Sequence, residues 1–188
     1  MTTVAKMNDA FSEALVAVFG IEGGFSDDPA DSGGATRYGI TEAVARRHGY
    51  TDSMRELPAD LARAIYRADY WDAQQLDAVA LLSRPIAFEL FDTGINMGAS
   101  QAGEFLQMSL NAFNRQACDY DDVEVDGEIG TRTLEALAAY LAHRKRDGET
   151  VLLRALNALQ GAAYIELAER RDKDERFVFG WFLRRVRI

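Results

Sequence analysis

Cysteine and histidine are scarce in this sequence. One cysteine, Cys118, stands among 188 residues, which excludes an internal disulfide and any zinc site built on cysteines. The two histidines, His48 and His143, are far apart, and each comes at the end of a run of helical character. A positive charge there suits the negative end of the helix dipole. We therefore expect neither histidine to bind a metal or to act in catalysis.

Long apolar runs and an excess of basic residues are also absent. No apolar run approaches the roughly 20 residues of a membrane span, and Met1–Phe11 lacks the apolar core of a signal peptide. We therefore expect no membrane span. We also expect the protein to be made in the cytoplasm and to leave it by a route that does not use a signal peptide. The 21 Lys and Arg residues are outnumbered by 30 Asp and Glu, for a net charge of −9. Nucleic acid is a disfavoured partner, because phosphate binding needs clustered basic side chains.

Several well-known functional motifs are missing as well. The sequence has no phosphate-binding G-x-x-x-x-G-K-[ST], no G-x-S-x-G elbow and no H-E-x-x-H pair. Asp122–Gly127 has the acidic spacing of a calcium loop, but its twelfth position is Thr133 instead of the bidentate Glu that such loops need. Nucleotide, acyl-hydrolase, zinc-protease and calcium-binding functions therefore have no support, and we expect no metal site.

Helical periodicity dominates what is present. The 48% hydrophobic content is that of a globular chain, and the length suits one domain. Residues 25–40, rich in Gly, Asp and Ser, are typical of a loop or a small β-ribbon. Residues 118–130 are acidic and irregular, and we expect a surface connection there. The pattern predicts about seven helices, over residues 9–22, 41–49, 58–70, 83–98, 100–113, 131–142 and 149–170.

Glu22 stands at the end of an otherwise apolar helical stripe. Apolar neighbours raise the pKa of a carboxyl group, as a general acid near neutral pH requires. The following loop contains five glycines within residues 22–41, and it carries Asp27, Asp28 and Asp31. Inverting glycoside hydrolysis needs a second carboxylate roughly 6.5–9.5 Å from the acid. The residues alone leave open which of these aspartates would serve, because Asp is also a common turn residue.

The loop resembles a known signature. Four of its segments, 22–25, 28–31, 33–36 and 38–41, are similar to the signature of glycoside hydrolase family 108. Its members are N-acetylmuramidases of phage endolysins and of bacterial secretion systems. The family usually has Tyr where this chain has Phe25. The spacing of Glu22, Asp31 and Thr36 also resembles the Glu–Asp–Thr set of phage-type lysozymes, which have one residue more before the Thr.

The resemblance extends over most of the chain. It continues through residues 65–72, 91–98, 125–134 and 179–181, the last two similar to a peptidoglycan-binding region. It implies a mainly α, lysozyme-like, two-lobed helical domain with a small β-ribbon near the active site. We expect residues 1–188 to form this single domain. Residues of about 8–90 would form its catalytic segment, and those of about 91–188 a peptidoglycan-binding-like segment that completes the cleft.

Roles for individual residues follow from the resemblance. Glu22 becomes the proton donor, Asp31 the base or electrostatic partner, and Thr36 the residue that positions water. Tyr38 either stacks on a sugar ring or only holds the ribbon together. Asn96 either contacts a sugar or is a helix residue hydrogen-bonded within the core. Asp92 and Arg184 or Arg185 are further residues near the expected site, although an Arg near a C-terminus is more often solvated.

The resemblance implies hydrolysis of the β-1,4 bond between N-acetylmuramic acid and N-acetylglucosamine in a peptidoglycan glycan strand. No cofactor is implied, since two carboxylates supply the proton transfers. We expect a monomer that acts on the cell wall, in the periplasm, after holin-dependent or dedicated release. Two alternatives remain: a lytic transglycosylase that uses Glu22 alone, and a non-catalytic wall-binding protein. The sequence also leaves open a phage or bacterial origin and an inverting or retaining outcome.

Overall fold

The computed structural model of the chain describes residues 9–19, 25–26 and 35–186. It divides into two compact units, Met1–Asp72 and Ala73–Ile188. Each unit has its own packed interior, and each is described by itself. None of the described helices is both long enough and apolar enough to cross a membrane.

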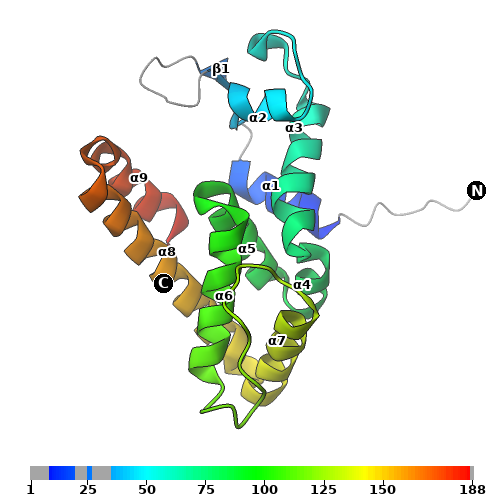
Figure 1. Cartoon of the computed structure of the whole chain (residues 1–188), viewed down its shortest axis with the longest axis vertical. Coiled ribbons are helices and arrows are strands. Elements are labelled where there is room, and N and C mark those ends of the chain that lie inside the picture. Colours follow the sequence, from blue (N-terminus) through cyan, green and yellow to red (C-terminus); the bar gives the residue numbers. More distant parts are fainter. Residues whose placement is uncertain (1–8, 20–24, 27–34, 187–188) are drawn as a thin grey trace, which may run out of the picture. The chain divides into compact units, whose positions relative to one another are not determined.

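The described part of the first unit contains three α-helices and a π-helical turn (Figure 1), and its buried side chains include the aromatic rings of Phe11, Tyr66 and Trp71. Asp9 caps its first helix by accepting a 2.6 Å hydrogen bond from the Ser12 amide. Trp71 is fully buried, and its ring meets that of Phe11 edge to face at 5.5 Å. The α-helices are α1 (Ala10–Phe19), α2 (Glu42–Arg47) and α3 (Ala59–Tyr66). A 3₁₀ turn at Met54–Glu56 lies between α2 and α3, and a π-helix at Arg67–Trp71 follows α3.

A three-stranded antiparallel ribbon lies between α1 and α2 in sequence. Its strands are β1 (Phe25–Ser26), β2 (Thr36–Arg37) and β3 (Ile40–Thr41), in that order across the sheet. Thr36 lies opposite Ser26 on one side and Thr41 on the other. The small β-ribbon expected within residues 25–40 is therefore confirmed.

The second unit is helical throughout its regular structure. Its central helix α5 begins at a Ser83 cap, whose hydroxyl accepts the Ile86 amide at 3.2 Å, and ends at Gly98, whose φ is +98°. Ile86, Leu90 and Phe91 of α5 are buried. The α-helices are α4 (Leu76–Leu82), α5 (Arg84–Met97), α6 (Ala99–Phe113), α7 (Thr131–Arg144), α8 (Arg146–Arg170) and α9 (Glu175–Arg185), with 3₁₀ turns at Asp72–Gln74 and Asp172–Asp174.

Two helices were not predicted from the sequence. α4 is only 7 residues long, so its apolar positions are too few to establish a helical period. α9 has no fully buried residue, and its Phe179 and Leu183 are 79% and 73% exposed, so it lacks a clear apolar face. The predicted helix over residues 58–70 departs from α-helical geometry after Tyr66, where the π-helix begins.

A buried amide fixes the irregular connection between α6 and α7. Gln107 of α6 is 1% exposed, and its side-chain nitrogen donates to the Asp126 carboxylate at 2.7 Å and to the Glu128 carbonyl at 3.0 Å. Its side-chain oxygen accepts from the Gly127 amide at 2.9 Å. The predicted surface connection is irregular as expected, but this amide, together with buried Val123 and Ile129, ties it to the helices.

The variant Gln107→Leu should lower the free energy of unfolding by about 1–3 kcal/mol, because the buried Gly127 amide loses its acceptor. Urea denaturation followed by circular dichroism measures the change. Met108→Leu, on the more exposed side of the same helix, is the matched control and should leave the midpoint unchanged. Equal midpoints for all three proteins would show that the amide does not hold the connection.

Candidate functional site

The predicted site residues fall in different parts of the structure. Glu22 and Asp31 lie outside the described residues. Thr36 lies in β2 and Tyr38 in the turn between β2 and β3, both in the first unit. Asn96 lies in the last turn of α5, in the second unit.

The β2–β3 turn holds Tyr38 in an unusual backbone conformation. Tyr38 and Gly39 are its two central residues, with φ of +52° and +72°. Two-residue hairpins favour positive φ at both positions, but a left-handed residue other than Gly costs about 1–2 kcal/mol. The Tyr66 hydroxyl offsets part of this cost by donating to the Tyr38 carbonyl at 2.9 Å. Tyr66 of α3 therefore acts as a positioning residue that the sequence did not reveal.

The side chain of Tyr38 is half-buried and lies beside a guanidinium group. The centre of the Arg37 guanidinium is 5.1 Å from the Tyr38 ring centroid, within cation–π range. One Arg37 nitrogen also donates to the Tyr38 hydroxyl at 3.4 Å. The ring thus combines an apolar face with a polar edge, the combination needed to meet a sugar ring and its hydroxyl groups. The sugar contact itself stays a prediction.

Thr36 is fixed between two strands and a helix. Its neighbour Ala35 accepts the Glu42 amide at 2.9 Å, which joins the start of β2 to the start of α2. On the facing strand, Thr41 caps α2 by accepting the Val44 amide at 3.4 Å. These bonds set the backbone of Thr36, whose side chain is half-buried. Its role in positioning water stays a prediction.

Asn96 makes a hydrogen bond within its own helix. Its side-chain nitrogen donates to the Asp92 carbonyl one turn earlier at 2.6 Å. This contact is the internal bonding that we set against a sugar contact. Asn96 is half-buried, so part of its amide reaches the surface.

Asp92 joins three helices of the second unit. Its carboxylate forms an ion pair with Arg185 of α9 and accepts a 3.2 Å hydrogen bond from Gln160 of α8. Burial raises the pKa of the nearby Tyr164 hydroxyl far above its usual value; the positive charge of Arg185 lowers this pKa in part, and the negative charges of Asp92 and Glu89 raise it. Arg184, the neighbour of Arg185, is exposed. The Asp92–Arg185 pair therefore holds α9 against α5.

Carboxylates and other ligating side chains are dispersed elsewhere. Among the residues that the structure describes, no three or more His, Cys, Asp or Glu side chains form a group that could hold a metal ion. Asp126, within the calcium-like segment, accepts hydrogen bonds from the Glu128 amide and from the Gln107 side chain, which lower its pKa.

The variant Tyr66→Phe should destabilise the first unit by about 0.5–1.5 kcal/mol, because the Tyr38 carbonyl loses a hydrogen-bond donor. Tyr70→Phe is the control, because among the described residues the Tyr70 hydroxyl has no hydrogen-bond partner. A loss of equal size in both variants would remove the positioning role of Tyr66.

Two families match adjoining parts of the chain. Residues 15–98 match the family described as Glycosyl hydrolase 108. Residues 102–186 match the family described as Predicted Peptidoglycan domain. The first match contains all five predicted site residues, from Glu22 to Asn96. The two segments follow each other in the order expected from the sequence.

A solved structure is similar over nearly the whole chain. SagA of Brucella abortus has 29% identical residues and a TM-score of 0.68, and the match covers 93% of this chain and 88% of that chain. The fold is therefore mainly helical and lysozyme-like, as expected. A search of curated proteins gave no match.

Proposed function

We propose that the chain is a peptidoglycan hydrolase of the glycoside hydrolase family 108 type, and that it is a muramidase. The proposed reaction is hydrolysis of the β-1,4 bond between N-acetylmuramic acid and N-acetylglucosamine. The observation that carries this proposal is the hydrolase match over residues 15–98, which contains the signature that begins at Glu22. The peptidoglycan domain at residues 102–186 supports the same substrate.

Each proposed site residue has one task in the reaction. Glu22, protonated at the end of an apolar helical stripe, donates its proton to the glycosidic oxygen as the bond to the anomeric carbon breaks. Asp31 accepts a proton from the attacking water, or stabilises the positive charge on the sugar ring. Thr36 positions that water, and Tyr38 and Asn96 contact the glycan. These steps need no cofactor.

The ribbon geometry supports this assignment of tasks. The short strands and the Tyr66 hydrogen bond fix the backbone around Thr36 and Tyr38 before substrate arrives. Catalysis gains from groups that are already oriented, because no free energy is then needed to order them during the reaction. A non-catalytic wall-binding protein would have no such need for a Glu–Asp–Thr set.

We place the site of action at the cell wall. A phage enzyme would reach it through holin-dependent holes in the membrane, and a bacterial enzyme through dedicated release. In both cases we expect a monomer, with residues of about 8–90 as its catalytic segment and residues of about 91–188 as its peptidoglycan-binding-like segment.

The variant Glu22→Gln should reduce turnover of purified peptidoglycan by about 10²–10⁴-fold, the usual contribution of a general acid. Its stability should be unchanged or higher, because the substitution removes a partly desolvated acid. Glu56→Gln, at an exposed position of the first unit, is the control and should retain full turnover. Unaltered turnover in the Glu22 variant would refute its assignment as the acid.

Mass spectrometry of the released fragments distinguishes hydrolysis from a lytic transglycosylase. Hydrolysis adds water and leaves reducing N-acetylmuramic acid ends, whereas internal attack by the sugar leaves anhydro ends. We expect reducing ends only. In a separate turnover assay, we expect Asp31→Asn to lose most of the activity. Anhydro ends without reducing ends would replace the hydrolase assignment with the transglycosylase.

A further inference from the structure

The second unit contains a pocket that none of the proposed catalytic residues lines. It has a volume of about 500 Å³ and lies where α6 and α7 end and α8 begins. Two of its lining residues, Tyr140 and Gly148, are buried, and the others reach the surface. The complete lining is Phe113, Tyr140, His143, Arg144, Asp147, Gly148 and Val151.

The corner that forms the pocket is tightly built. A single residue, Lys145, joins α7 to α8, with a φ of +51°. A side chain at Gly148 would meet the Arg144 Cβ at 2.8 Å, so only Gly lets the two helices lie this close. The Tyr140 hydroxyl donates to the Gly148 carbonyl at 2.9 Å. The pocket is therefore shaped before any ligand arrives.

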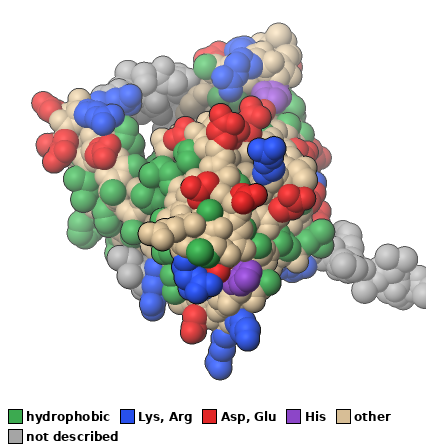
Figure 2. Space-filling view, turned by 60° about the horizontal axis from the view of Figure 1, so that its bottom comes forward, with side chains coloured by type: hydrophobic (Ala, Val, Ile, Leu, Met, Phe, Trp, Pro, Cys, Tyr) green, Lys and Arg blue, Asp and Glu red, His purple; other side chains and the backbone are tan. Residues whose placement is uncertain are grey.

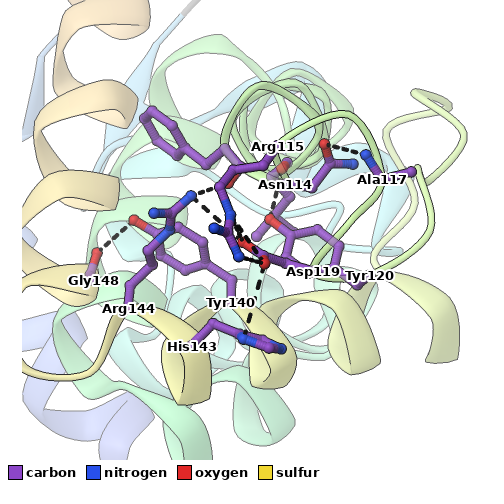
Figure 3. Close-up of polar contacts among 11 residues, drawn as sticks. Asn114, Arg115, Ala117, Asp119, Tyr120, Tyr140, His143, Arg144 and Gly148 are labelled. Atoms are coloured by element: carbon purple, nitrogen blue, oxygen red, sulfur yellow. Dashed lines mark hydrogen bonds and ion pairs between the residues drawn. The ribbon is translucent and has the colours of Figure 1, made fainter.

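Basic side chains gather on one side of the pocket around a buried carboxylate. The Asp119 side chain is 2% exposed and pairs with Arg115, while an Arg144 nitrogen lies 3.5 Å and His143 Nδ1 4.0 Å from its oxygens. The hydrogen bond from Arg115 and the neighbouring positive charges lower the pKa of Asp119. Figure 3 shows these side chains converging on Asp119. One carboxylate thus faces two guanidinium groups and an imidazole.

These contacts orient the Arg144 guanidinium group and leave some of its N–H donors available for a ligand. The nitrogen that faces Asp119 also donates to the Phe113 carbonyl at 2.6 Å. Its other two nitrogens have no partner in the part of the chain that the structure describes. A guanidinium held in this way suits a ligand carboxylate, because its planar fork is already oriented. The chain as a whole has a net charge of −9, so a cluster of basic side chains contrasts with its overall charge. Figure 2 shows acidic side chains spread over the visible face and basic side chains in separate groups.

Asp147 gives the pocket a negative group as well. It is exposed, and its carboxylate has no hydrogen-bond or ion-pair partner among the described residues. Between the charges the lining is apolar: Val151 is 40% exposed, and Phe113 is half-buried. A cationic group, an anionic group and an aliphatic surface together complement a zwitterionic amino-acid group at the end of a methylene chain.

We propose that this pocket binds the free amino-acid end of a diamino acid in an uncross-linked peptidoglycan stem peptide, which rests on the proposed action on peptidoglycan. Arg144 and His143 take the α-carboxylate, Asp147 takes the α-ammonium group, and Phe113 and Val151 line the methylene chain. The peptide arm of the substrate is thereby recognised in the segment that follows the hydrolase segment. A cross-linked diamino acid has lost its ammonium charge and binds less well.

The aromatic rings favour a peptide over a sugar. Tyr140 is 1% exposed, and its ring stacks on Phe113 at a centroid distance of 5.8 Å. The Tyr140 ring in turn covers one face of the Phe113 ring. Stacking on a sugar needs a broad open aromatic face, and at most the other face of Phe113 is left, which suffices to line a methylene chain.

Calorimetric titration of the full-length protein tests the proposal with three probes: meso-diaminopimelic acid, pimelic acid without amino groups, and a chitin trimer. We expect diaminopimelic acid to bind at least about fivefold more tightly than pimelic acid, because one partly exposed ion pair contributes an effect of this size. The chitin trimer should not compete with diaminopimelic acid. Asp147→Asn should remove this preference, while Asp172→Asn, exposed elsewhere in the second unit, keeps it. Equal binding of the two acids, competition by the trimer or no binding of diaminopimelic acid would each overturn the proposal.

A second pair of variants tests the location. Val151→Trp fills the pocket from an exposed position and should abolish binding. Ala158→Trp lies two turns further along the same face of α8, outside the pocket, and should not. Val151→Trp should also raise KM for peptide-bearing peptidoglycan while leaving turnover of peptide-free glycan strands unchanged. If the wild type cleaves neither substrate, the proposed muramidase function fails, and the titration still decides the pocket.

Discussion

The buried amide of Gln107 is the interaction on which the second unit depends most. An amide without partners inside a helical core would cost several kcal/mol, so the irregular segment after α6 must stay where its groups meet it. Asp126, Gly127 and Glu128 provide those groups. The start of α7 follows directly from there, and with it the helix that carries Tyr140 and Arg144. A single polar residue thus sets both the connection and the helix after it.

In the first unit, the main structural constraint is the short ribbon, which must be held in one conformation. Strands of two residues have too few hydrogen bonds to be stable alone. Contacts from outside the ribbon supply what is missing: the Tyr66 hydroxyl on the Tyr38 carbonyl, and the Thr41 cap on α2. Backbone strain at Tyr38 persists because these neighbours determine its position, as is common at functional sites.

The two matched families give these local features a common purpose. A hydrolase segment and a peptidoglycan domain act on one polymer, which has a glycan strand and a peptide arm. The ribbon belongs to the hydrolase segment, and the pocket at the α7–α8 corner to the peptidoglycan domain. In our proposals, the glycan meets the first and the peptide arm meets the second. Division of recognition in this way increases the affinity for a polymer without stronger individual contacts.

The sequence by itself determined the helices with clear periods and the ribbon, because apolar spacing, glycines and capping residues such as Ser83 and Thr41 act locally. The loop signature also carried the resemblance to glycoside hydrolase family 108. The sequence also singled out Thr36, Tyr38 and Asn96, and Glu22 and Asp31 outside the described residues. Only the tertiary structure decided that Tyr66 bonds to Tyr38, that Arg185 pairs with Asp92, and that Phe113, Arg144 and Asp147 line one pocket. These contacts join residues distant in sequence or on different helices, and no local preference encodes which of them meet. α9 formed without a clear apolar period for the same reason: its ion pair and ring contacts come from other helices.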